Sequence, residues 1–171
     1  MSDITKNNTQ TDRKQMSKIA LFAGSFDPFT RGHEAVVEAA LQLFDEVVVA
    51  VGENVSKRGL LSIEERCRLI EDTYKGNEHV RVAKYLTLTG EFAREVGATV
   101  LVRGVRNTVD FEFERSIEAT NRALFPELTT VLIPTPAEYM HISSSVVREL
   151  LAFGREVGDY LPQNIKIENY L

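Results

Sequence analysis

One segment of the chain combines a glycine-bounded turn with a histidine, a pairing suited to binding an anion. It reads Gly24-Ser-Phe-Asp-Pro-Phe-Thr-Arg-Gly-His33 and follows an apolar run of strand length. We expect His33 to fall in the first turn of the next helix, near the positive end of the helix dipole, where a phosphate is favoured. The segment matches neither the dinucleotide-binding glycine pattern nor the P-loop. A tight turn with a capping histidine explains it equally well.

A second segment, Ile142-Ser-Ser-Ser-Val-Val-Arg148, stands at the start of a predicted helix. One serine suffices as the helix N-cap, so a purely structural role leaves two hydroxyls as neutral surface groups. Arg148 is more informative, because a cation in the first turn opposes the helix dipole. Beside three hydroxyls and free backbone N–H groups, this arginine favours a phosphate bound at the same helix end.

A third segment, Arg103-Gly-Val-Arg106, directly follows a predicted strand. Its two arginines could form a bidentate phosphate clamp. They could instead form surface salt bridges with nearby acids, namely Asp110, Glu112 and Glu114. Its position after a strand favours the clamp.

Apolar runs of strand length alternate with segments of helical periodicity from residue 18 onward. The predicted strands are Ile19–Ala23, Val47–Val51, Val80–Ala83, Val100–Val102 and Val131–Ile133, and the predicted helices are about Gly32–Phe44, Ile63–Tyr74, Gly90–Val96, Phe111–Leu124 and Ser144–Phe153. Continuous β-branched runs such as VVVAV indicate parallel strands covered on both faces, joined by right-handed crossovers. The sequence therefore predicts one α/β domain with a doubly wound, five-stranded parallel sheet.

In such a sheet the ligand binds at the carboxyl ends of the strands, where the strand order reverses. The loops at that edge are residues 24–31, 52–61, 84–89, 103–110 and 134–143. Ser56-Lys57-Arg58 is weak evidence alone, since most loop charges are solvated, and it gains value only from this edge. The spacing of Ser62 and Glu65 predicts a capping box at one helix start, and Pro162 predicts a short closing C-terminal helix.

Composition restricts the function further. The chain has 171 residues, 43% of them apolar, and a net charge of −5, which describes one globular domain without the basic field of a nonspecific nucleic-acid binder. No run approaches the roughly 18 apolar residues of a membrane span, and no secretory signal is apparent. Residues 1–15 hold one aliphatic side chain, so we expect a disordered extension ahead of a domain over residues 16–171.

The sequence lacks the motifs of several enzyme classes. The chain contains neither a G-x-S-x-G nucleophile elbow nor an H-E-x-x-H helix, and His79 and His141 have no zinc-ligand spacing, so no metal ligands are expected. The single cysteine, Cys67, excludes an intrachain disulfide and fits a reducing cytoplasm. We interpret it as a buried helix residue rather than a nucleophile.

Together, the motifs resemble those of the nucleotidylyltransferases and, within them, the bacterial phosphopantetheine adenylyltransferases. The resemblance covers residues 18–162 in order and spacing, and rests on G-S-F-D-P-F-T-R-G-H, S-K, R-G-V-R and I-S-S-S-V-V-R. Thr30 in place of a first histidine, D-F-E-F-E after R-G-V-R, and N-R-A-L-F-P-E-L over 121–128 point to this member. The chain departs from the family pattern at Ser25, which replaces threonine, at Arg58-Gly59, which replaces Lys-Pro, and at Thr89. These departures concern pantetheine contacts and leave the reaction unaffected.

The resemblance implies a Rossmann-like nucleotidylyltransferase fold and transfer of an adenylyl group from ATP, accompanied by Mg²⁺, to 4′-phosphopantetheine, giving dephospho-coenzyme A and pyrophosphate. By the same resemblance, His33 would stabilise the transition state at the α-phosphate, and Lys57 and Arg106 would be catalytic. The acceptor would be held by Ser25, Lys57, Thr89 and Arg103. ATP would be held by Ser25, Phe26, His33, Gly104, Val105, Arg106, Glu114, Tyr139, Met140, His141, Ile142, Ser143, Ser144 and Ser145.

The family also implies a homohexamer and feedback by coenzyme A. Two other functions are alternatives: a related nicotinamide-nucleotide adenylyltransferase or cytidylyltransferase, and a noncatalytic adenine-nucleotide sensor of the same fold. Relatives of the first kind tend to carry H-x-G-H, where this chain has Thr30-Arg-Gly-His33. A sensor would have no need of Lys57 and Arg103 at an acceptor phosphate.

Overall fold

A five-stranded parallel sheet forms the centre of the computed structural model, which describes residues 17–52 and 59–171. The strands are β1 (Ile19–Gly24), β2 (Glu46–Gly52), β3 (Val80–Tyr85), β4 (Val100–Val105) and β5 (Thr129–Pro134). Their order is β3-β2-β1-β4-β5, and every pair is parallel. The predicted fold class is confirmed. The predictions for residues 1–15 and for Ser56-Lys57-Arg58 lie outside the described residues.

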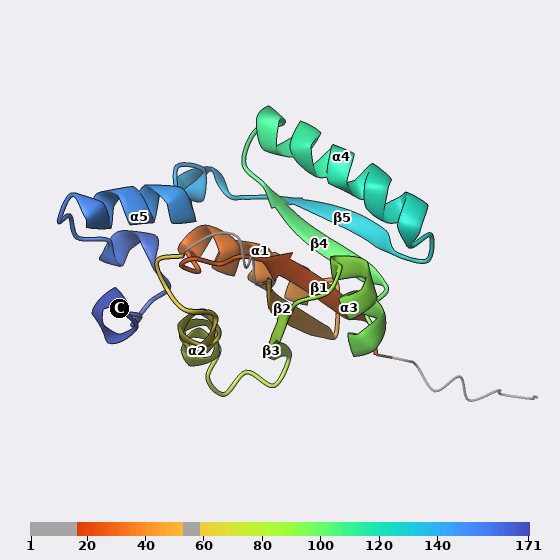
Figure 1. Ribbon diagram of the computed structural model, residues 1–171, viewed down its shortest axis with the longest axis horizontal. Helices are drawn as coiled ribbons and strands as arrows, with labels where there is room; N and C mark the ends of the chain where they lie inside the picture. The colour runs from red at the N-terminus through yellow and green to blue at the C-terminus, as the bar shows by residue number, and fades with distance from the viewer. Residues whose placement is uncertain (1–16, 53–58) are drawn as a thin grey trace, which may run out of the picture.

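Helices cover both faces of this sheet (Figure 1). They are α1 (Arg31–Leu41), α2 (Ile63–Thr73), α3 (Thr89–Val96), α4 (Thr108–Leu124) and α5 (Ser144–Ala152). Alternate side chains of β2 divide between two cores: Val47, Val49 and Val51 pack in the core with α1, α2 and α5, whereas Val48 and Ala50 pack in the core with α3. This division explains why the strand is apolar at successive positions rather than at alternate ones.

Side-chain caps determine where α2 and α4 begin. Ser62 accepts a hydrogen bond from the backbone N–H of Glu65 at 3.1 Å, which confirms the predicted start of α2. The helix α4 begins at Thr108, earlier than the predicted Phe111, because Asn107 caps it by accepting from the backbone N–H of Asp110 at 2.9 Å. An asparagine cap was the available signal for this earlier start.

The closing helix is shorter and later than the prediction from Pro162. It is a 3₁₀ turn over Ile167–Asn169, and another 3₁₀ turn over Gly158–Tyr160 precedes the proline. Asn164 has a φ of 70°, a left-handed conformation that is incompatible with a helix continuing from Pro162. Among the described helices, none has the length and apolar character required to cross a membrane.

Candidate active site

A cavity of about 390 Å³ opens at the carboxyl ends of β1 and β4, on the edge where the strand order reverses. The loops after β1 and β4 and the start of α5 form its walls. It is lined by Phe22, Ala23, Gly24, Ser25, Phe26, Thr30, Gly32, His33, Val36, Arg103, Gly104, Arg106, Asp110, Phe113, Glu114, Thr135, Ile142, Ser143, Ser144, Ser145 and Arg148. Three of the predicted phosphate-binding segments therefore meet at one cavity.

His33 lies in the first turn of α1, as predicted, and its ring is held in one orientation. Nδ1 accepts a hydrogen bond from the backbone N–H of Thr30 at 3.0 Å, and the Thr30 hydroxyl lies 3.1 Å from the same nitrogen. Burial, followed by the positive charges of Arg106 and Arg103, lowers the pKa of His33 to about 4. The imidazole is therefore neutral at pH 7, and a neutral ring whose Nδ1 accepts must carry its proton on Nε2.

The loop after β1 packs closely around the ring of Phe26. Phe26 has a φ of 44°, is 3% exposed, and packs edge-on against the His33 ring at 5.1 Å between centroids. A Cβ at Gly24 would lie 2.9 Å from the Phe26 ring, so only glycine fits at that position. The aromatic packing supplies the desolvation that lowers the His33 pKa.

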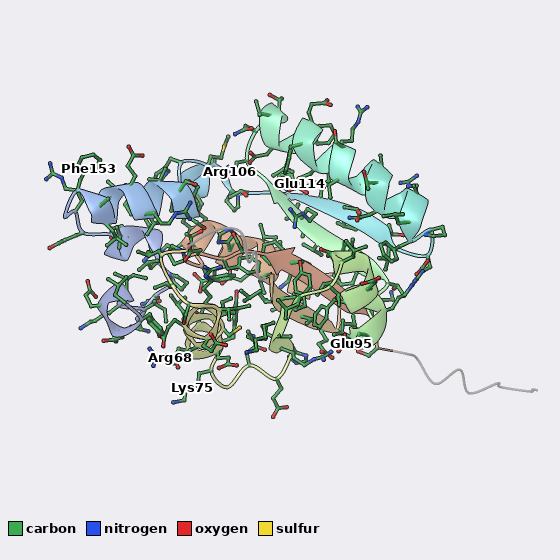
Figure 2. All side chains as sticks on the ribbon, in the orientation of Figure 1. Arg68, Lys75, Glu95, Arg106, Glu114 and Phe153 are labelled. Carbon is green, nitrogen blue, oxygen red and sulfur yellow. The ribbon has the colours of Figure 1, made fainter. Side chains whose placement is uncertain are left out.

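Both arginines of the R-G-V-R segment line the cavity and also pair with acids. Arg103 donates to Glu114 at 2.6 and 2.7 Å through two nitrogens and to the carbonyl of Ala23 through a third. Arg106 donates to Asp110 at 2.8 and 3.2 Å. Figure 2 shows Arg106 at the end of β4 and Glu114 on α4. The two interpretations of this segment are thus compatible, because both ion pairs face the cavity rather than the outer surface.

The two ion pairs differ in how far they are exposed to solvent. Glu114 is 8% exposed, so its carboxylate holds Arg103 inside the protein. The pair of Arg106 and Asp110 is more open, and the hydrogen bond from Arg106 lowers the pKa of Asp110. Both guanidinium groups keep N–H groups that a bound phosphate could use, since each has five donors. The third acid, Glu112, lies 3.9 Å from Arg115 and takes no part in this cavity.

The serines at the start of α5 divide their roles. Ser143 caps the helix by accepting from the backbone N–H of Val146 at 3.2 Å. The hydroxyl of Ser144 donates to the carbonyl of Pro28 at 2.8 Å, and that of Ser145 accepts from Arg148 at 3.1 Å. All three serines line the cavity, but Ser144 is already engaged with the loop after β1.

A second cavity, of about 310 Å³, adjoins the first at the carboxyl ends of β1, β2 and β3. It is lined by Ala23, Gly24, Ser25, Gly52, Tyr85, Thr87, Leu88, Thr89 and Arg103. The two cavities share Ala23, Gly24, Ser25 and Arg103 as a common wall. The predicted acceptor residues Ser25, Thr89 and Arg103 therefore lie together, and Lys57 lies outside the described residues.

Some predicted ATP contacts are not at the larger cavity. Val105 and the segment 139–141 do not line it. Tyr139 lines a separate hollow with Arg31 and Glu38, Met140 is 45% exposed, and the ring of His141 packs against Tyr160. Sequence reasoning missed Tyr85, whose hydroxyl lies 3.0 Å from that of Thr89, although its place at a strand end was a signal. Within residues 17–52 and 59–171, no group of three His, Cys, Asp or Glu side chains is placed to hold a metal ion.

Comparison with known proteins identifies the family. A family model described as cytidylyltransferase-like matches residues 21–150. The phosphopantetheine adenylyltransferase of Porphyromonas gingivalis is 49% identical over 150 residues, which cover 88% of this chain and 97% of that protein. The protein of the same name from Cytophaga hutchinsonii is 44% identical over 88% of this chain and 100% of its own length.

Solved structures of low sequence identity share the fold. A putative nicotinate-nucleotide adenylyltransferase from Vibrio parahaemolyticus has a TM-score of 0.60 at 23% identity, and covers 85% of this chain and 94% of that chain. A bifunctional NMN adenylyltransferase/ADP ribose pyrophosphatase from Francisella tularensis has a TM-score of 0.67 at 18% identity, over 89% of this chain and 47% of that one. The family model and these relatives agree with the motifs and the fold, and the chain therefore belongs to the cytidylyltransferase-like family and, within that family, to the phosphopantetheine adenylyltransferases.

Proposed function

We propose that the larger cavity binds ATP and that the adjoining one binds the phosphate end of 4′-phosphopantetheine. The chain is an adenylyltransferase that joins these two substrates to give dephospho-coenzyme A and pyrophosphate, which agrees with the name phosphopantetheine adenylyltransferase that its relatives carry. The observation that carries the site assignment is the wall of Ala23, Gly24, Ser25 and Arg103 shared by the two cavities. Substrates bound on either side of it would bring an acceptor phosphate next to the α-phosphate of ATP.

The chemistry requires no protein nucleophile. An oxygen of the acceptor phosphate attacks the α-phosphorus, and the bond from the α-phosphorus to the bridging oxygen breaks, so that its electron pair leaves with pyrophosphate. The protein therefore acts by positioning the reactants and by stabilising charge. We assign to the neutral His33 a hydrogen bond from Nε2–H to an α-phosphate oxygen, where negative charge accumulates in the transition state.

The arginines serve different phosphates in this proposal. Arg103 lines both cavities, so its remaining N–H groups would contact the acceptor phosphate beside the α-phosphate. Arg106 lines only the larger of the two and would hold the departing pyrophosphate. A bound polyphosphate would share Arg106 with Asp110, since a guanidinium can contact two anions at once. Lys57 would add a further cation for the acceptor phosphate, as the family resemblance implies.

Mg²⁺ would enter as part of the substrate MgATP. The cavity carboxylates Asp110 and Glu114 are each held by an arginine, so oxygen ligands for the ion would come chiefly from the nucleotide phosphates. The ion would neutralise phosphate charge and so ease attack at the α-phosphorus.

We further propose a homohexamer, feedback by coenzyme A and a cytoplasmic location. The helix α4 buries Glu114 but exposes Val109, Phe111, Phe113 and Leu124, an apolar set that other copies of the chain could cover. Coenzyme A contains both the adenylyl and the phosphopantetheine groups, so it would compete for both cavities. A reducing cytoplasm agrees with a single cysteine.

Sedimentation of the purified chain tests the proposed homohexamer. It should give a mass of six copies, and a monomer would contradict the assembly.

The reverse reaction tests the assignment without relying on the acceptor assay. Protein supplied with dephospho-coenzyme A, pyrophosphate and Mg²⁺ should produce ATP, because one in-line transfer passes through the same transition state in both directions. Substitution of dephospho-coenzyme A by NAD is the control. ATP formed from NAD and pyrophosphate, and not from dephospho-coenzyme A, would assign the chain to nicotinamide-nucleotide chemistry instead.

A further inference from the structure

The loop after β1 is fastened to the segment that precedes α2 by a buried carboxylate. Asp27 is 6% exposed, and its two oxygens accept hydrogen bonds from the backbone N–H of Leu60 at 2.8 Å and of Leu61 at 2.9 Å. Charge-assisted bonds of this kind are stronger than bonds between neutral groups. Asp27 does not line either of the two cavities, so its carboxylate acts on the protein and not on a ligand.

Arg66, on α2, completes this connection. Its Nε lies 3.3 Å from Asp27 Oδ1 and donates to the carbonyl of Leu61 at 2.9 Å. Another nitrogen of the same guanidinium donates to the carbonyl of Ser25 at 3.3 Å. The side chain is 11% exposed. Arg66 thus contacts the backbone of the predicted substrate residue Ser25, the carboxylate of Asp27 and the segment before α2.

A glycine makes room for this guanidinium. A Cβ at Gly59 would lie 1.8 Å from a terminal nitrogen of Arg66 and 2.9 Å from Asp27 Oδ2. Any side chain at that position would displace the arginine or the aspartate. Gly59 itself is exposed, so a substitution there would disturb the connection without opening a space in the core.

The connection stands beside strained backbone at the common wall. Phe26, between Ser25 and Asp27, has a φ of 44°, which costs free energy for a residue other than glycine and persists only where neighbours hold it. Ser25 lines both cavities and Phe26 lines the larger one. The contacts of Asp27 and Arg66 lie on either side of this strained residue.

We propose that Asp27 and Arg66 are positioning residues that hold Ser25 and Phe26 where the ATP cavity meets the acceptor cavity. This inference rests on the proposed function. A displacement of about 1 Å between reactants costs on the order of 10²-fold in rate. ATP binding would suffer less, because the other walls of the larger cavity remain in place. Loss of the pair therefore lowers kcat far more than it lowers the affinity for ATP.

The first test measures kcat and ATP affinity for Asp27→Asn and Arg66→Lys. We expect kcat to fall at least ~10-fold in each, with the ATP Kd from calorimetry within about threefold of that of the unaltered protein and with the same stoichiometry. The matched control is Asp45→Asn, because Asp45 also accepts from a backbone N–H, that of Lys18 at 2.7 Å, at the opposite end of β1. This control should keep the kcat of the unaltered protein.

Gly59→Ala provides a second test that leaves both side chains intact, should Asp27→Asn fail to fold. It should reproduce the effect of Arg66→Lys, whereas Gly158→Ala, where a Cβ meets nothing within 4 Å, should not. The double variant Asp27→Asn/Arg66→Lys should lose little more kcat than one single variant, because the two side chains contact each other and belong to one connected set of hydrogen bonds. Additive losses of kcat in the double variant, or an unchanged kcat in the single variants, would overturn the proposal. A kcat that falls only in proportion to the fraction of the protein that binds ATP would also overturn it. If the unaltered protein makes no pyrophosphate from 4′-phosphopantetheine, it is the proposed function that fails.

Discussion

The backbone N–H of Thr30 donates to Nδ1 of His33 at 3.0 Å, and this bond selects the tautomer of the histidine. An amide N–H can only donate, so Nδ1 must be unprotonated and a neutral ring carries its proton on Nε2. The low pKa of His33, about 4, keeps the ring neutral at pH 7. The group offered to a phosphate is therefore a fixed, neutral N–H donor rather than an imidazolium cation.

Removal of this donor should slow the reaction with little effect on ATP binding. We expect His33→Ala to lower kcat by at least ~10²-fold, comparable to the loss of one oxyanion-hole donor. His33→Gln can place an amide N–H near the position of Nε2 and should retain more activity than His33→Asn, whose shorter side chain replaces Nδ1 instead. Steady-state kinetics of the three variants checks this order. Equal activity of His33→Gln and His33→Asn would contradict the assigned tautomer.

The buried histidine should also make stability depend on pH. Its pKa is about 4 in the folded protein and 6.5 when unperturbed, so above pH 6.5 it is neutral in both states and contributes nothing. As the pH falls from 6.5 toward 4, only the unfolded state gains this proton, and the free energy of unfolding decreases, by about 3 kcal/mol in total. His33→Gln should lack this decrease. Titration by NMR should give His33 a midpoint near 4, and a midpoint near 6.5 would contradict its burial.

Arg106 should discriminate between the two substrates. Because it lines only the larger of the two cavities, Arg106→Ala should raise the KM for ATP about tenfold or more and leave the KM for 4′-phosphopantetheine within about twofold. The matched control is Arg115→Ala, an exposed arginine on α4 that lies 3.9 Å from Glu112. Equal changes in both KM values for Arg106→Ala would contradict separate phosphate sites.

Ser144 should contribute more to the stability of the loop after β1 than to the binding of ATP. Its hydroxyl donates to the carbonyl of Pro28 at 2.8 Å, so Ser144→Ala should lower the free energy of unfolding by roughly 0.5–1.5 kcal/mol. Ser116→Ala is the control, because that serine donates to the carbonyl of Glu112 within the exposed face of α4. Urea unfolding compares the two variants. If Ser144→Ala raised the KM for ATP more than Arg106→Ala does, this result would show that Ser144 binds phosphate directly.

The sequence predicted which loops would meet, because parallel strands place their carboxyl ends along one edge. His33, Arg103 and Ser145 come from three separate segments, yet all line one cavity. The strand cores were equally clear, since runs such as Val47–Val51 suit only strands buried on both faces. These predictions depend on periodicity and topology, which the order of residues expresses directly.

The contacts that fix the loops could not be predicted. Arg148, interpreted as a phosphate ligand, donates to the carbonyl of Asp27 at 2.6 Å, and Arg66 gave no signal beyond that of a helix charge. The distant partners of both, which are the backbone carbonyls of Ser25 and Asp27 and the carboxylate of Asp27, lie far away in the sequence. A backbone carbonyl has no side chain to reveal it, so the need for a donor appears only once the loop conformation is known. The role of His141 in holding ATP is implied by the resemblance alone and stays a prediction, and its ring packs against Tyr160.

The most direct measurement is pyrophosphate release by the purified protein with MgATP and a choice of acceptor. With 4′-phosphopantetheine, pyrophosphate should form continuously, and dephospho-coenzyme A should form in equal amount. Unphosphorylated pantetheine should give none, because the attacking oxygen belongs to the phosphate and the cations of the shared wall would lack their anion. CTP should be a much poorer donor than ATP. Pyrophosphate released with nicotinamide mononucleotide, and not with 4′-phosphopantetheine, would contradict the assigned reaction.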